Sequence, residues 1–170
     1  FTWTDVGNAE RLAAQHGTAL RYCPDGAGWL WWDGTRWARD TLGVHEQLAT
    51  RMVKAMRAES ASIADEALRE KFDRFAARTE SDRGIKALVS RAQVTDPFPV
   101  ARARFDTDPW VLNCANGTLD LKTGRLLPHS PGAHLSKLAP VAYDPAAPCA
   151  FWGAWLGQLT RGNPALAAVI

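Results

Sequence analysis

The segment WLWWDGTRW, residues 29–37, decides much of the fold, because it sets four of the chain's eight tryptophans around an Asp-Gly pair. Asp-Gly between strand-like residues is a strong local signal for a β-hairpin, since a type I′ turn needs positive φ at both central positions. A two-residue turn at Asp33 and Gly34 predicts three cross-strand pairs: Trp32 with Thr35, Trp31 with Arg36, and Leu30 with Trp37.

Directly opposed side chains share a face of a hairpin. The pairing therefore predicts Leu30, Trp32 and Trp37 on one face, and Trp29, Trp31 and Arg36 on the other. Large aromatic side chains dominate burial energetics, so we predict that Trp29, Trp32 and Trp37 belong to the core. For Trp31 the sequence leaves both the core and the surface as alternatives. If it is exposed beside Arg36, it could stack on a single-stranded base.

Helical patterns flank this hairpin. In TDVGNAERLAAQHG, residues 4–17, Thr4 or Asp5 can cap the first turn, and Gly17 stands where a C-terminal cap needs positive φ. Residues 43–94 contain three amphipathic helices in series, which predicts a small bundle.

The apolar period returns to two after residue 105. Asn116-Gly117 and Thr123-Gly124 are turn formers between short strand-like runs, which predicts an antiparallel β-meander. After a proline-rich stretch, residues 149–160 turn helical again. The predicted class is therefore α+β: an N-terminal helix and Trp-rich hairpin, a central three-helix region, a short meander and C-terminal helices.

We predict one domain over residues 1–148 and the truncated start of another over residues 149–170. The chain has 170 residues and begins with Phe instead of Met, so we expect a piece of a longer protein. A chain of this length buries a core without disulfides or metals. Its net charge of +2 permits contact with nucleic acid but does not by itself argue for it.

Several functional classes are disfavoured. Three scattered cysteines and four scattered histidines give no zinc spacing, so we expect no metal site. No apolar stretch reaches the roughly 20 residues of a membrane span, and no signal peptide opens the chain, so we expect a cytoplasmic protein without a membrane partner. No phosphate loop, dinucleotide fingerprint or GxSxG elbow is present, so we expect no enzyme activity and no cofactor in this chain.

Two polar groups remain as candidates. Arg51, Lys54 and Arg57 lie along one side of a predicted helix. They are either a solvated face or, together with Trp31 and Arg36, a weak track for single-stranded DNA. Asn8 and Arg11 lie one helical turn apart, and the simplest interpretation is that they brace the neighbouring hairpin.

The order of motifs resembles the domain that precedes the superfamily 3 helicase in phage and plasmid primase-helicases, a domain type also found in the poxvirus primase-helicase. The matching motifs run from about residue 4 to 155: TDxGNAxRL, RY, WxxWDGxxW, DxDPWxLN, NGTLDLxTG and YDPxAxCxxW. The motif residues expected to have structural roles are Asp5, Asn8, Arg11, Trp29, Asp33, Gly34, Trp37, Asn113, Asn116, Gly117, Asp120 and Gly124.

The resemblance implies a place in a larger replication protein. A primase domain often lies upstream in such proteins, and a hexameric helicase that uses ATP and Mg²⁺ lies downstream. The implied partners of this chain are those two domains and single-stranded or forked DNA. The resemblance carries no catalytic residue. The alternative is a module that assembles the helicase ring without touching DNA. A carbohydrate-binding hairpin is disfavoured by the motif match and by the lack of an export signal.

Overall fold

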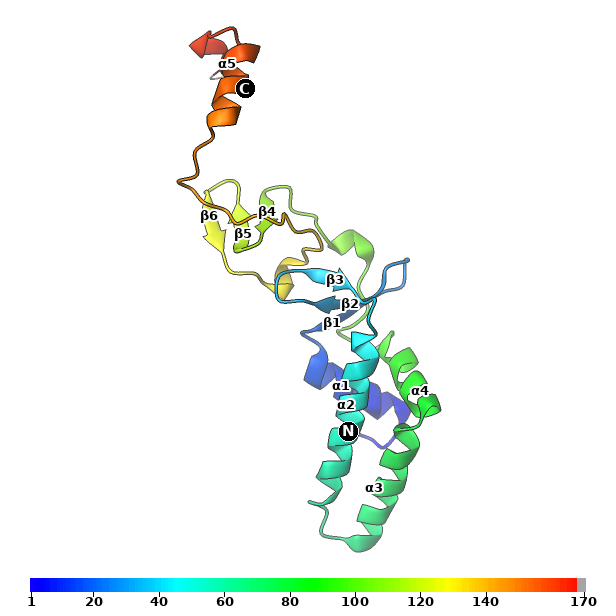
Figure 1. Ribbon diagram of the computed structural model, residues 1–170. Helices are drawn as coiled ribbons and strands as arrows, with labels where there is room; N and C mark the ends of the chain where they lie inside the picture. Colours follow the sequence, from blue (N-terminus) through cyan, green and yellow to red (C-terminus); the bar gives the residue numbers. More distant parts are fainter. Residues whose placement is uncertain (168–170) are drawn as a thin grey trace.

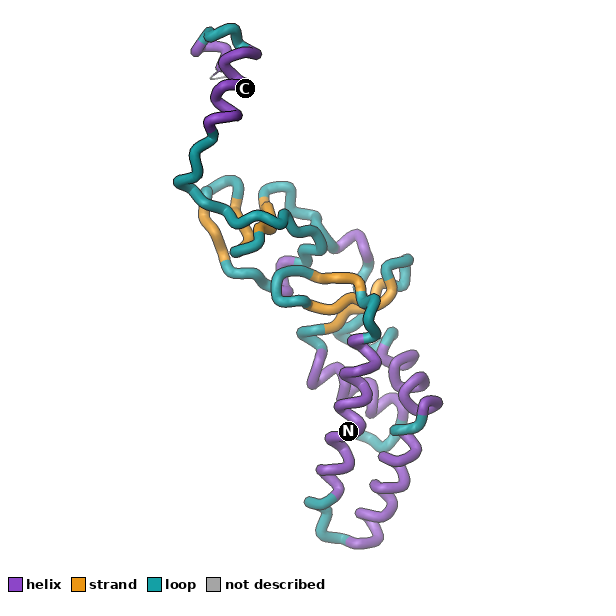
Figure 2. Tube along the Cα trace, viewed as in Figure 1, coloured by secondary structure: helices purple, strands orange, loops and turns teal. Residues whose placement is uncertain are grey.

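A computed structural model describes residues 1–167 of the chain and confirms the α+β class. The molecule is elongated (Figure 1). Four helices lie together at the end that holds the N-terminus, two small antiparallel sheets follow, and a separate helix stands at the opposite end. Loops instead of helices make most of the connections around the two sheets (Figure 2).

The helical lobe consists of α1 (Asp5–His16), α2 (Val44–Ser60), α3 (Glu66–Thr79) and α4 (Asp82–Ala92). The three helices predicted for residues 43–94 are confirmed, and α1 packs against α4 and α2. Side-chain caps begin three of these helices. The oxygens of Thr4, Asp65 and Ser81 accept hydrogen bonds from the backbone N–H three residues later, at 2.9 to 3.1 Å.

The prediction that Gly17 adopts positive φ is wrong, because its φ is −63°. A glycine is needed there for close approach instead. A Cβ at Gly17 would lie 2.4 Å from the Ala13 carbonyl oxygen and 2.8 Å from Cγ of Pro97. The glycine therefore lets the end of α1 pass close to the segment that follows α4.

The first sheet contains β1 (Leu20–Cys23), β2 (Gly28–Trp32) and β3 (Trp37–Arg39), in that order. Its β2–β3 register differs from the prediction: Trp32 pairs with Trp37, Trp31 with Ala38, and Leu30 with Arg39. The connection is thus a four-residue loop, residues 33–36. It is held by the Asp33 carboxylate, whose Oδ1 accepts hydrogen bonds from Thr35 N, Thr35 Oγ1 and Arg36 N at 2.7 to 2.9 Å.

Gly34 has the predicted positive φ, at +99°. Because the register is displaced by two residues, the predicted division of the tryptophans between the two faces survives. Trp29 and Trp31 face the helical core, together with Leu20 and Tyr22. The opposite face carries a second, smaller apolar cluster: Cys23, Leu30 and Trp37, with Trp32, Val100 and Phe105 packed against it.

The predicted meander is confirmed as a second sheet of β4 (Val111–Cys114), β5 (Gly117–Asp120) and β6 (Arg125–Leu127). Its first turn is displaced by one residue. Cys114 pairs with Gly117, so the central residues are Ala115 and Asn116 instead of Asn116 and Gly117. Gly117 begins β5 with φ +153°, and a Cβ there would lie 2.5 Å from the Leu127 carbonyl oxygen.

The other motif residues of the second sheet also have structural roles. The Asn116 side chain donates to Tyr143 O and accepts from Tyr143 N, both at 2.9 Å, and so ties down the segment that follows the sheet. Asp120 accepts from Lys122 N and from the Thr123 hydroxyl, both at 2.8 Å. Gly124 closes the same loop with φ +69°.

Trp37 and Asn113 join the two sheets. The Trp37 backbone N–H donates to Leu135 O at 2.8 Å, and its indole Nε1 donates to Pro131 O at 2.9 Å. Asn113 is buried, and its Nδ2 donates to Thr35 O and to Lys137 O, both at 3.0 Å. The segment 131–137, which begins with a 3-10 turn at Pro131–Ala133, therefore acts as the seam between the sheets.

The C-terminal helices are α5 (Ala150–Leu159) and α6 (Pro164–Ala167). They stand apart from both sheets (Figures 1 and 2). The apolar side chains of α5 face solvent, and Phe151 is 87% exposed. The last three positions of the predicted helix in NPALAAVI, residues 168–170, lie outside the described residues.

Candidate nucleic-acid interface

The structure does not bring Trp31 and Arg36 together, so the predicted shared face is wrong. Trp31 is half-buried against the helical core. Arg36 belongs to the loop between β2 and β3 and lines a cavity beside the opposite face of the sheet. The reason is the longer loop. The Asp33 carboxylate accepts hydrogen bonds that close a loop of four residues instead of two, so Arg36 lies in the loop and is not paired with β2.

The predicted cations of α2 are exposed, but they are not equivalent. Arg57 Nη1 forms an ion pair with Glu80 Oε2 at 3.0 Å. Arg51 and Lys54 form no ion pair with any residue in the described range 1–167. Burial, and then the charge of Arg51, lower the pKa of His16, so Arg51 acts on the C-terminal turn of α1. Two unpaired cations remain along this helix.

Asn8 and Arg11 brace the helices and not the hairpin, so that prediction is also wrong. Asn8 is buried, and its Nδ2 donates to the Thr79 hydroxyl at 3.3 Å. Arg11 Nη1 lies 2.7 Å from Glu59 Oε2. Both contacts tie α1 to the ends of α2 and α3. Asp5 lies in the first turn of α1, where a negative charge complements the helix dipole.

A cavity of about 660 Å³ opens beside the β3 edge of the first sheet. The outer face of the sheet forms one wall, and the segments around residues 102–106 and 136–137 form the other. Four cationic side chains line it: Arg36, Arg39, Arg102 and Lys137. Cavities of this size are typical of sites for small ligands or single units of a polymer.

The single carboxylate in this lining is already occupied by donors. Asp106 Oδ1 accepts from Ser136 N at 2.9 Å, and Oδ2 accepts from the Ser136 hydroxyl at 2.6 Å. Cys23 forms part of the wall as a neutral thiol. Burial raises the pKa of Cys23, the neighbouring Asp25 raises it further, and Arg102 offsets part of the rise. The four cations of the lining thus outnumber its one carboxylate, with Asp25 beside Arg102 and Asp33 beside Arg36 as further anions nearby.

Arg36 carries an unsatisfied donor. Its Nε is buried and makes no hydrogen bond with any residue of the described part of the chain. It lies 3.5 Å from Asp33 Oδ2, which makes an ion pair without hydrogen-bond geometry. Burial alone would raise the pKa of Asp33, but hydrogen bonds from Thr35 and Arg36 outweigh burial and lower it. Asp33 therefore remains an anion that holds the Arg36 side chain in place.

Sequence reasoning found Arg36 but missed Arg39, Arg102 and Lys137. These residues come from three separate segments, and no spacing rule connects them. The run ARARF, residues 101–105, was a local basic signal. Hydrogen bonds from Val100 N to Tyr22 O, at 2.9 Å, and from Arg102 N to Asp25 Oδ2, at 3.0 Å, hold this segment beside the first sheet.

These observations define an α+β domain with a cation-lined cavity beside its first sheet. Residues 9–161 match the family described as "D5 N terminal like", and the chain belongs to that family. The family provides a domain of phage and plasmid primase-helicases that precedes the helicase, so the resemblance inferred from the motifs is confirmed. No curated protein matches the chain.

Residues 1–167 offer neither a membrane-spanning helix nor a group of metal ligands. None of the helices in that range is long and apolar enough to cross a membrane. Within the same range, no three His, Cys, Asp or Glu side chains gather closely enough to hold a metal ion.

Proposed function

We propose that this domain connects the primase and helicase parts of a replicative primase-helicase and contacts single-stranded DNA. The observation that carries the proposal is the group of cations at the cavity. Arg39, Arg102 and Lys137 form no ion pair with any other residue between 1 and 167. Cations left unpaired around a concave surface are what a polyanion requires.

The contact with DNA is electrostatic and modest. The chain has a net charge of only +2, so we expect affinity no better than about micromolar, in the range where phosphate contacts alone hold a strand. Arg51 and Lys54 on α2 are two further exposed cations, on the helical lobe and not in the cavity lining. ATP and Mg²⁺ belong to the helicase in this proposal, and the domain itself performs no catalysis.

The proposal is tested by measuring how chain 1–170 binds a fluorescent oligothymidylate at increasing salt. With three or four phosphates neutralised, log K should fall against log salt with a slope of about −2 to −3, from roughly −0.7 per contact on a single strand. No binding at low salt, or binding that salt does not weaken, would refute DNA contact. Incubation with ATP and Mg²⁺ should release no phosphate above a mock purification.

A second candidate is a module that assembles the helicase ring without DNA contact. The exposed aromatic side chains of α5 favour it: Phe151 is 87% exposed and Trp152 is 52% exposed. Exposed apolar surface of this kind is typical of protein interfaces. Sedimentation at micromolar concentration separates the two functions. We expect a monomer for the DNA-contacting connector, whereas a discrete hexamer would favour the assembly module.

A further inference from the structure

We infer that the cavity beside β3 is a seat for the phosphate groups of a single nucleic-acid strand and that it leaves the bases unread. The inference rests on the proposed DNA contact and names the site and the chemistry of that contact. It replaces the stacking surface that the sequence predicted at Trp31.

The donors of the cavity suit a phosphodiester. Arg36, Arg39 and Arg102 offer planar guanidinium groups, which match the paired oxygens of a phosphate, and Lys137 adds a point charge. The buried Arg36 Nε has no hydrogen-bond acceptor among residues 1–167. Nε lies 3.5 Å from Asp33 Oδ2, and the Arg36 side chain is 40% exposed, so an anionic oxygen in the cavity would contact the exposed part of the guanidinium and not the buried Nε.

Trp37, one of the two aromatic side chains that line the cavity, cannot stack on a base, while Phe105 is half-buried. Trp37 is 1% exposed. The Arg21 guanidinium lies over its ring at 4.9 Å, and the rings of Trp32 and Phe105 approach it edge-on at 5.8 and 6.4 Å. Recognition of bases on single strands depends on open aromatic faces. A site in which the tryptophan ring is covered and three cations form no ion pair within residues 1–167 therefore suits the backbone of a strand more than its bases.

The volume also favours a ligand larger than a lone anion. About 660 Å³ is far more than one phosphate group fills, and the cavity is open to solvent, so a chain can enter and leave it. The four cations come from β3, the loop before it, the 3-10 turn η1 (Arg102–Arg104) and the seam at Lys137. They belong to four separate segments that line one cavity, which suits contact with more than one phosphate.

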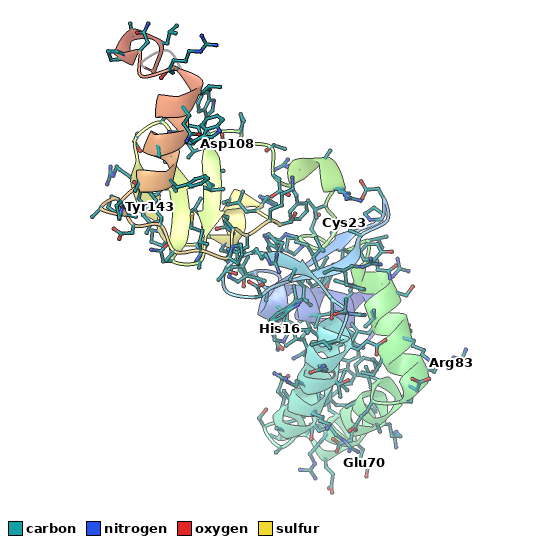
Figure 3. The ribbon with its side chains drawn as sticks, turned by 45° about the horizontal axis from the view of Figure 1, so that its top comes forward. His16, Cys23, Glu70, Arg83, Asp108 and Tyr143 are labelled. Atoms are coloured by element: carbon teal, nitrogen blue, oxygen red, sulfur yellow. The ribbon has the colours of Figure 1, made fainter. Side chains whose placement is uncertain are left out.

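The test compares two variants that each remove two positive charges. Arg39→Gln with Arg102→Gln removes cavity cations whose side chains are exposed and make no hydrogen bond or ion pair within residues 1–167, so folding should be preserved. The control, Arg83→Gln with Arg91→Gln, removes two exposed cations of α4. Figure 3 shows Arg83 in the helical lobe, away from Cys23 in the cavity wall.

The cavity variant should bind labelled oligothymidylate about tenfold more weakly at low salt, because two charge-assisted contacts are lost. Its salt slope should shrink by about 1.4, from roughly 0.7 for each phosphate contact. The control should lose less than about twofold, since distant exposed charges are screened. Oligothymidylate, oligoadenylate and a strand with abasic sites should bind with similar affinity.

Each other outcome overturns the inference in its own way. If the wild-type chain binds no strand, both the proposed function and this site fail. If it binds but the cavity and control variants are equal, DNA contact stands and the site is elsewhere. A large loss on the abasic strand would mean that bases are read. If thymidine triphosphate displaces the strand at concentrations where inorganic triphosphate does not, the cavity holds a free nucleotide instead of a strand backbone.

Discussion

Replacing Trp37 with phenylalanine tests how much the packing between the two sheets contributes to the free energy of unfolding. Trp37 is buried, and its indole N–H donates to Pro131 O at 2.9 Å. Phenylalanine keeps an aromatic ring but loses that donor and leaves part of the site empty. A net hydrogen bond contributes about 1 kcal/mol. Pro131 O keeps a second donor, His134 N at 3.3 Å, so it is not left unpaired.

The lost ring adds to this cost. Truncating a buried tryptophan to alanine costs about 3–5 kcal/mol, and the change to phenylalanine removes only a fraction of the same contacts. Together these effects predict that Trp37→Phe lowers the free energy of unfolding by about 2–4 kcal/mol. Urea denaturation followed by far-ultraviolet circular dichroism measures the change, provided that the slope with denaturant stays constant.

Trp110→Phe is the matched control. Trp110 is 51% exposed, and like Trp37 it has a cation over its ring, Lys122 Nζ at 5.2 Å. The comparison therefore cancels the cation–π contact and leaves burial and the indole hydrogen bond. We expect Trp110→Phe to change stability by no more than about 0.5 kcal/mol, as surface substitutions usually do. Equal losses in the two variants would refute the role of Trp37 as the link between the sheets.

Three more substitutions test other parts of the structure. Gly34→Val should lower the free energy of unfolding by at least about 1 kcal/mol, because Gly34 has φ +99° and the substitution adds backbone strain without a steric clash. The control is Gly153→Ala in α5, which also has open space around it and should leave stability unchanged or raise it in the same thermal melt. Trp31→Ala should lower stability by about 2 kcal/mol or more through lost core packing and leave the salt slope of DNA binding unchanged, so a folded, stable variant that no longer binds DNA would restore the stacking surface. Burial alone would raise the pKa of Asp40, but hydrogen bonds from His45 and Val44 outweigh it and lower the pKa, so its stabilisation is present above the unfolded value of about 3.9 and is lost as pH falls through the folded pKa. Asp40→Asn should therefore flatten the loss of stability below about pH 4, and an unchanged acid-denaturation curve would contradict this.

Local rules were enough for much of the fold. Helix caps at Thr4 and Ser81 and the period of the apolar residues in 43–94 depend on neighbours within one or two turns, so the sequence alone located these helices. The division of tryptophans between two faces also followed from alternation, and it survived a register error of two residues. The motif order identified the family without any coordinates.

The predictions that failed were those that depended on which groups a side chain contacts in the folded protein. The loop after β2 has four residues because Asp33 captures three donors, a competition that a two-residue turn rule does not contain. Asn8 and Arg11 found partners 71 and 48 residues away instead of on the adjacent hairpin.

The sequence by itself therefore determined the elements, the apolar faces and the family of this protein, because those depend on short-range chemistry. Only the tertiary structure decided that Trp31 belongs to the core and that Arg36 joins Arg39, Arg102 and Lys137 at one cavity. Lys137 lies 101 positions after Arg36 in the chain. Charges so far apart in sequence meet only when packing of the seam at Trp37 and Asn113 brings their segments together, and no periodicity encodes that meeting.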